Sequence, residues 1–116
     1  MNLVSLAEAK AHLYIDDGAH DQWLTLMIAA VSDAVAMWVK DVDRLFVPEP
    51  DSNGDLVPSG NVRPAVKAAV LTELAAKFRY REGEGEVLVE SHEGHGYVLS
   101  RGATSYLVPL RKSTVA

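Results

Sequence analysis

Hydrophobic residues recur at helical spacing in three segments of the chain. The first segment, 5–13, has apolar residues along one side at intervals of three and four positions. The segments 19–40 and 63–82 are longer, and each has one apolar stripe typical of an amphipathic helix. The pattern predicts a mainly α-helical fold, a small bundle of three main helices. The two longer stripes consist of Leu24, Met27, Ile28, Val31, Val35 and Trp38, and of Val66, Val70, Leu74 and Phe78.

The predicted helix starts have recognisable capping residues. Ser5 and Glu8 form a capping-box pattern, in which each side chain accepts a hydrogen bond from the backbone amide of the other residue. Asp17 is expected to cap the second helix, because the first amides of a helix have no partner within it. Pro64 suits the first turn of the third helix, where a missing amide costs nothing.

The segments outside these helices have turn-forming and β-prone residues. Three prolines and the pair Asn53-Gly54 interrupt the helical pattern in 41–62, which predicts a short β-hairpin or flap. Asn-Gly favours positive φ at both central positions of a tight turn. Glycines in 82–86 end the third helix, and 87–116 is expected to be an extended C-terminal segment. We expect 1–116 to form a single domain.

Composition and charge exclude several classes of function. The net charge is −5, and residues 1–60 contain ten acidic and three basic side chains. An acidic first half disfavours duplex binding, which depends on neutralising phosphates. The chain has no cysteine, which excludes disulfides and thiolate chemistry. No unbroken apolar run approaches the roughly 18 residues of a membrane span, and the first residues lack the pattern of a signal peptide. We therefore expect no membrane partner.

Two histidine-containing clusters are candidate metal sites. His12, Asp16, Asp17 and His20 are suitable ligands for a divalent cation, and a metal-dependent hydrolase using them is one alternative. These residues are spread over two predicted helices and a turn, however, so a helix junction explains them better. A second cluster, in a glycine-rich loop, is expected to be solvated; it consists of His92 and His95 with Glu90 and Glu93. We expect no metal, no cofactor and no enzymatic activity.

The second and third helices have more apolar surface than a three-helix chain can bury. Trp23, Leu26 and Met37 flank the stripe of the second helix, and an alanine-rich side flanks that of the third. This surplus indicates either self-association or coverage by the C-terminal pieces, and the sequence does not decide between them. The large side chains Trp23 and Trp38 fit either a core or an interface.

Three blocks of the sequence resemble the head–tail connector (head-completion adaptor) family of long-tailed bacteriophages. The first block has Leu6, Glu8, Ala9, Lys10, His12, Leu13, Ile15 and Asp16 in the family's L-x-E-A-K-x-H-L-x-I-D pattern. The second ends with Phe78, Arg81 and Glu82, and the third has Leu107, Val108, Pro109, Leu110 and Arg111. Phe78 and Leu110 stand where the family usually has tyrosine, so each lacks a hydroxyl.

The resemblance implies a structural virion protein at the head–tail junction, assembled in the host cytoplasm. Such connectors form a ring of about a dozen subunits beneath the portal protein, extend the DNA channel and receive a tail-side completion or stopper protein. DNA would pass without sequence-specific binding. Candidate subunit contacts are Trp23, Trp38, Phe78 and Arg81, and the candidate segment for docking to the portal or a neighbour consists of Tyr106, Leu107, Pro109, Leu110 and Arg111.

Two further interpretations concern the tail and the first two helices. Pro109 cannot donate to a sheet ladder, so the docking segment is expected to be a short or edge strand suited to strand addition. The alternative is that it covers the spare side of the second helix. The junction at 14–19 also permits a small helix-turn-helix DNA-binding regulator, although the second helix lacks base-reading side chains at its start.

Overall fold

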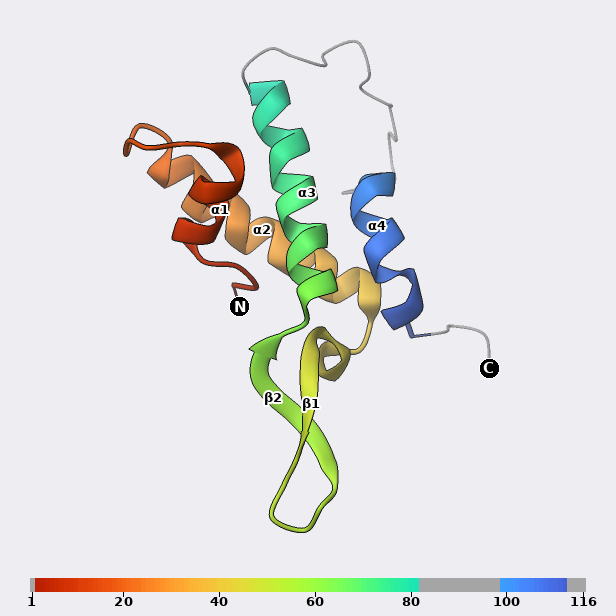
Figure 1. The fold of residues 1–116 in the computed structure, drawn as a ribbon. Helices are drawn as coiled ribbons and strands as arrows, with labels where there is room; N and C mark the ends of the chain where they lie inside the picture. Colours follow the sequence, from red (N-terminus) through yellow and green to blue (C-terminus); the bar gives the residue numbers. More distant parts are fainter. Residues whose placement is uncertain (1, 82–98, 113–116) are drawn as a thin grey trace.

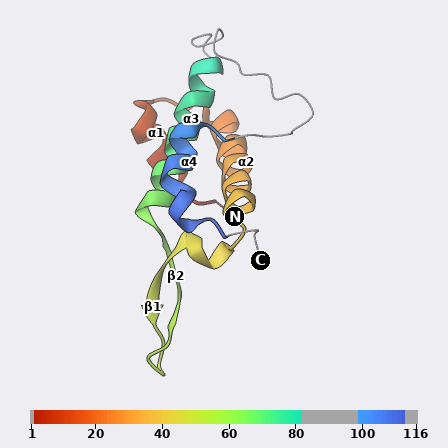
Figure 2. The same ribbon diagram turned by 90° about the vertical axis from the view of Figure 1, so that its right-hand side faces the viewer.

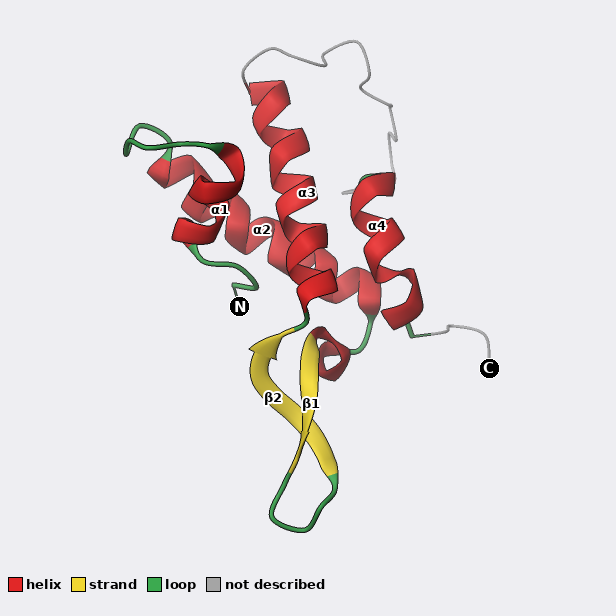
Figure 3. Cartoon of the chain, viewed as in Figure 1, coloured by secondary structure: helices red, strands yellow, loops and turns green. Residues whose placement is uncertain are grey.

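The computed structural model describes residues 2–81 and 99–112, and these form a mainly helical molecule with one two-stranded hairpin (Figures 1 and 3). The prediction of three main helices with a hairpin between the second and third is confirmed. A fourth helix follows near the C-terminus. The elements are α1 (Leu6–Leu13), α2 (Asp21–Val39), the 3-10 helix η1 (Val42–Leu45), β1 (Phe46–Pro50), β2 (Leu56–Val62), α3 (Pro64–Arg81), α4 (Arg101–Leu107) and the 3-10 helix η3 (Val108–Leu110).

The helices form two layers around one apolar core. Helices α1, α3 and α4 lie on one side of α2 (Figure 2). The inner face of α2 meets α3 through the stripes expected from the sequence, although Met27 and Trp38 are only partly buried. The N-terminal segment closes the core at one edge, because the amide of Leu3 donates to the Oγ of buried Ser32 at 3.0 Å. The fully buried aliphatic residues include Leu24, Val31, Val35, Val66, Val70 and Leu74.

The helix-start predictions have different outcomes. The Glu8 amide donates to Ser5 Oγ at 3.0 Å, and the Ser5 amide donates to Glu8 Oε1 at 2.9 Å, which confirms the capping box. The prediction that Asp17 caps the second helix is wrong. Helix α2 starts after His20, which makes no side-chain capping bond, and Asp17 instead accepts the Ala19 amide at 3.2 Å. Asp17 therefore stabilises the turn that precedes the helix.

The hairpin projects from the base of the helical layers (Figure 1). Its strands are antiparallel, with Glu49 opposite Val57, and a register shift lies between Phe46 and Pro48. The side chain of Asp51 orders the connecting loop by accepting the amides of Asn53 and Asp55 at 2.8 and 3.0 Å. Gly54 has a φ of 84°, whereas Asn53 is not among the residues with positive φ, so the predicted turn geometry is only half right.

The described part of the C-terminal segment, 99–112, is helical over 101–110 where an extended chain was expected. The rest of the expected extended segment, 87–98 and 113–116, lies outside the described residues. Residues 101–107 form α4, and η3 continues it to Leu110. The periodic residues Leu99, Ala103 and Leu107 are all buried against the core, and that burial outweighs the β-preference of the local residues. Helix α4 packs closely on α3, since a Cβ on Gly102 would lie 3.0 Å from Thr72 Cγ2. The tail thus covers α3, whereas the spare side of α2 that it was expected to cover as the alternative stays exposed at Leu26 and Met37.

Candidate functional site

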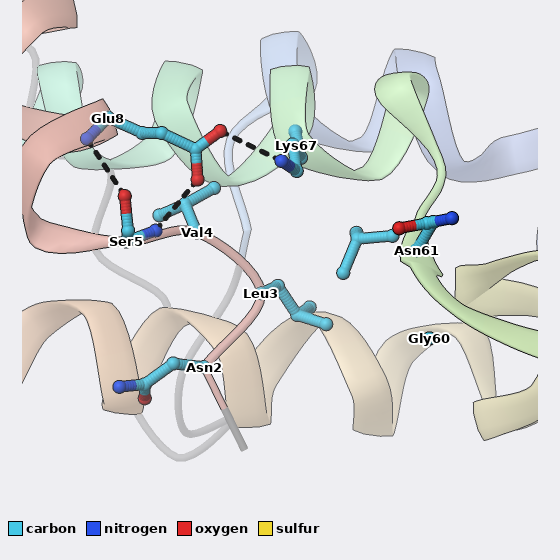
Figure 4. Close-up of a pocket in the computed structure, with 9 residues that line it drawn as sticks. Asn2, Leu3, Val4, Ser5, Glu8, Gly60, Asn61 and Lys67 are labelled. Carbon is cyan, nitrogen blue, oxygen red and sulfur yellow. Dashed lines mark hydrogen bonds and ion pairs between the residues drawn. The ribbon is translucent and has the colours of Figure 1, made fainter.

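An open pocket of about 450 Å³ lies where the N-terminal segment, the end of β2 and α3 meet (Figure 4). On its rim, Lys67 Nζ lies 2.8 Å from Glu8 Oε2, so an ion pair joins α1 to α3. The hydrogen bond from Lys67, followed by that from the Ser5 backbone, lowers the pKa of Glu8. Among the pocket residues, Ser5, Glu8 and Lys67 pair with one another. Its lining consists of Asn2, Leu3, Val4, Ser5, Glu8, Gly60, Asn61, Val62 and Lys67.

The lowered pKa of Glu8 gives stability a specific pH dependence. A carboxylate whose pKa is lower in the folded state stabilises the fold above its unfolded pKa, and this contribution is lost as the pH falls through the folded value. Glu8→Gln keeps an acceptor for the Ser5 amide and removes the ion pair. We expect it to cost less than about 1 kcal/mol at neutral pH, because the pair is partly exposed, and to flatten the acid limb of the stability curve. Urea unfolding as a function of pH measures both effects.

Glu49→Gln is the matched control for this experiment, because the described residues provide no ion-pair partner for that carboxylate. It should leave the slope of the acid limb unchanged. An unchanged slope for Glu8→Gln as well would show that the Glu8–Lys67 pair contributes nothing to the fold.

Two of the candidate interface residues pack on one another inside the subunit. Phe78 makes edge-on contacts with Trp23, at 5.9 Å between ring centroids, and with His20, at 5.1 Å. These contacts join the start of α2 to the end of α3. Arg81 ends α3, but its side chain lies outside the described residues, so its expected role in subunit contacts stays a prediction.

The C-terminal segment completes the end of α2. The Arg111 guanidinium lies 4.5 Å from the centroid of the Trp38 ring, and its Nε donates to the Trp38 carbonyl at 3.0 Å. The Lys112 amide donates to the Val39 carbonyl at 2.8 Å. The last carbonyls of a helix have no partner within it, so these two bonds satisfy groups that α2 leaves open.

Only some of the residues expected to dock to a partner are accessible in the folded subunit. Leu107 is fully buried, and Leu110 is partly buried against the core, so neither is available to a partner in this conformation. Tyr106 is 46% exposed, and Pro109 and Arg111 are exposed. The expected strand for strand addition is not formed, because 101–110 is helical.

A buried carboxylate that the sequence analysis missed positions α4. Glu73 is 2% exposed, and its Oε2 accepts the Ser100 amide at 3.0 Å. Its Oε1 lies 3.9 Å from Lys77 Nζ on the next turn of α3. Ser100 in turn caps α4 by accepting the Ala103 amide at 3.3 Å. The sequence did contain one indication of this buried carboxylate, since Glu73 directly precedes Leu74, a member of the apolar stripe of the third helix.

The outer face of α2 has no partner within the described chain. Leu26 is 66% exposed and Met37 is 73% exposed, with Ala30 and the charged Asp33 exposed between them. By length and composition alone, α2 could cross a membrane, with a hydropathy of 1.4. The core helix of a water-soluble protein meets the same criterion, and the inner face of α2 is buried against α3. This outer face is therefore a candidate contact surface.

The expected metal-ligand clusters give no assembled site among residues 2–81 and 99–112, which contain no group of three or more potential ligands. His12 is exposed on the last turn of α1, Asp16 and Asp17 are exposed in the following turn, and His20 packs against Phe78. His92, His95, Glu90 and Glu93 lie outside the described residues.

Comparison with known families supplies what the geometry of these contact surfaces does not, the class of protein. The family model described as Phage gp6-like head-tail connector protein matches residues 3–95, which is most of the chain. The chain belongs to this family. The resemblance noted in the sequence is confirmed. No curated protein and no solved structure matches the chain.

Membership defines the class of function. This is a structural, non-enzymatic family, so the connector is a phage virion protein of the head–tail junction that assembles with head and tail components. The helix-turn-helix regulator and the metal-dependent hydrolase are set aside by this result. The exposed outer face of α2 and the exposed side of α4 and η3 are therefore candidate assembly contacts.

Proposed function

We propose that the connector forms a closed ring of about a dozen subunits beneath the portal protein, extends the DNA channel and offers a platform to a tail-side completion or stopper protein. The observation that supports this most directly is the outer face of α2, where the large apolar side chains of Leu26 and Met37 are exposed beside Asp33. Burying a large apolar side chain contributes about 1.5–3 kcal/mol. A neighbouring subunit on this face would recover that energy, and repetition around a closed ring would make many modest contacts stable together.

The charge of the first half is consistent with a channel through which DNA moves. Residues 1–60 contain ten acidic and three basic side chains. A basic wall would hold the phosphates by releasing counterions, whereas an acidic wall leaves DNA free to slide. We accordingly propose that DNA passes through the ring without sequence-specific binding.

The portal contact is proposed for the exposed side of the C-terminal segment. Tyr106, Val108 and Pro109 are exposed on α4 and η3, and Val108 is 61% exposed. Their neighbours Leu107 and Leu110 fix this surface by packing inward. A rigid helical surface loses less conformational entropy on binding than an extended tail would.

The ring proposal predicts that charge on the outer face of α2 prevents assembly. The double variant Leu26→Glu/Met37→Glu should fold as the wild type does, because both side chains point to solvent, yet it should stay monomeric. Native mass spectrometry and electron microscopy, with and without portal, measure the outcome. We expect an association constant lowered at least about tenfold, since two charges would be buried without partners.

Ala7→Glu is the matched control, because it places the same charge on an exposed position of α1. It should assemble as the wild type does. Normal rings from the α2 variant would show that this face is not the subunit contact. A wild-type protein that stays monomeric at every concentration, with portal present, would exclude the ring.

A further inference from the structure

The end of α2, the base of the hairpin and the C-terminal segment meet at one end of the helical layers (Figure 1). Five cationic residues lie on or beside these segments. We call them the junction patch. Three backbone-directed bonds tie the three segments together: Arg63 Nε to the Arg44 carbonyl at 2.9 Å, Arg44 Nη1 to the Leu110 carbonyl at 3.3 Å, and the Lys112 amide to the Val39 carbonyl at 2.8 Å. The patch consists of Lys40, Arg44, Arg63, Arg111 and Lys112.

The junction patch has a positive net charge, although the protein as a whole is acidic. Asp41 and Asp43 lie beside it, and Asp41 Oδ2 is 3.3 Å from Arg44 Nε. The five cationic side chains and these two carboxylates give a local net charge of +3, whereas the whole chain has a net charge of −5. Lys40, Arg44, Arg111 and Lys112 are exposed. A guanidinium has five N–H donors. The bonds that Arg44, Arg63 and Arg111 donate use only some of these, so each side chain keeps donors for a partner.

The hairpin has the opposite charge. Residues 45–62 contain no basic side chain and three acidic ones, Glu49, Asp51 and Asp55, all near the tip. The Asp51 side chain is occupied in ordering the loop. Glu49 and Asp55 have no ion-pair partner among the described residues. The tip is therefore an ordered acidic surface with two free carboxylates.

The tip cannot neutralise the patch of its own subunit. Asp55 lies beyond the whole of β1, whose five residues span roughly 16 Å at the rise of a β-strand, and Glu49 lies three residues, or roughly 10 Å, past the start of that strand. Both distances exceed the screening length of roughly 8 Å at physiological salt. Figure 1 shows the tip at the far end of the hairpin from η1. A tip from another molecule can approach this patch directly.

We propose that the acidic hairpin tip of one connector subunit docks on the junction patch of a second copy. Tip and patch are different surfaces, so the contact is head-to-tail, the type that closes into rings. The patch is also continuous with the proposed contact face of α2, because Lys40 follows Met37 by one turn. Strand addition is disfavoured, since Pro48, Pro50 and Pro58 interrupt the hydrogen-bonding positions of both strands. The contact is made by charged side chains.

Charge-swapped variants test this pairing, which rests on the proposed ring. Glu49→Lys/Asp55→Lys makes the tip basic, and Lys40→Glu/Lys112→Glu makes the patch less basic and partly acidic. Each variant alone should lower the association constant at least about tenfold at low salt, because like charges then face one another. An equimolar mixture should assemble again, because alternating subunits restore opposite charges at every contact. Light scattering and native mass spectrometry report both results.

The controls separate this inference from the ring itself. Asp16→Lys reverses an exposed charge elsewhere and should assemble as the wild type does. If both swapped variants also assemble normally, or if the folded variants fail to assemble when mixed, the tip–patch contact is wrong and the ring stands on wild-type assembly. A wild type that never assembles overturns both proposals. A patch variant that loses duplex DNA binding in fluorescence anisotropy, with unchanged assembly, would assign the patch to DNA instead.

Discussion

Leu107→Ala should lower the free energy of unfolding by about 3 kcal/mol. Its side chain is fully buried in the core shared by α2, α3 and α4. Shortening such a leucine removes its transfer energy and leaves a cavity, which together cost about 2–5 kcal/mol. Urea unfolding followed by circular dichroism measures the change. Truncation after Ser105 should cost more, because it also removes the bonds that Arg111 and Lys112 make to α2.

Tyr106→Ala is the matched control, one residue away and 46% exposed. It should cost less than about 1 kcal/mol, as substitutions at exposed positions do, and should weaken portal binding if the proposed contact is right. Equal stability of the Leu107 variant and the wild type would mean that α4 does not belong to the core.

Glu73→Ala should cost about 3 kcal/mol and should loosen α4 selectively. The substitution removes the acceptor of the Ser100 amide and leaves the Lys77 ammonium without this carboxylate. Breaking a buried charged interaction from one side costs about 3–5 kcal/mol, and we expect the lower end because Lys77 is only partly buried. Hydrogen exchange of the α4 amides should accelerate more than that of the α2 amides, since Glu73 positions the start of α4 alone.

Glu73→Gln retains a carbonyl oxygen for the Ser100 amide, so it should recover a substantial part of the loss. Uniform acceleration of exchange across all four helices would contradict the local role and would indicate a general loss of packing around Leu74.

The parts of the fold that the sequence predicted are those in which local and tertiary preferences agree. The α2 and α3 stripes are periodic over many turns, and their buried residues match that period. The Ser5–Glu8 box is a local device whose two bonds need nothing from the rest of the chain. The contact surfaces were less predictable, because Phe78 and Trp23 meet each other only once α2 and α3 have packed.

Helix α4 was missed because its local residues favour another structure. Tyr106 and Val108 are β-prone, Gly102 is a poor helix former, and Pro109 suggested an edge strand. Two features of the sequence favoured a helix instead, namely the spacing of Leu99, Ala103 and Leu107 and the capping residue Ser100. They determine the structure only when α3 provides a surface on which these apolar residues are buried. Asp17 was misassigned for a similar reason, since its acceptor serves the turn before α2.

The bonds from Arg111 and Lys112 to the end of α2 have a consequence for synthesis of the protein. Trp38 and Val39 leave the ribosome before the groups that complete their helix, because these lie more than 70 positions later in the chain. Until residue 112 has emerged, the nascent chain has α2 with an open C-terminus and a hairpin base without its Arg44–Leu110 bond. The junction patch is therefore incomplete while residues 1–110 are being synthesised.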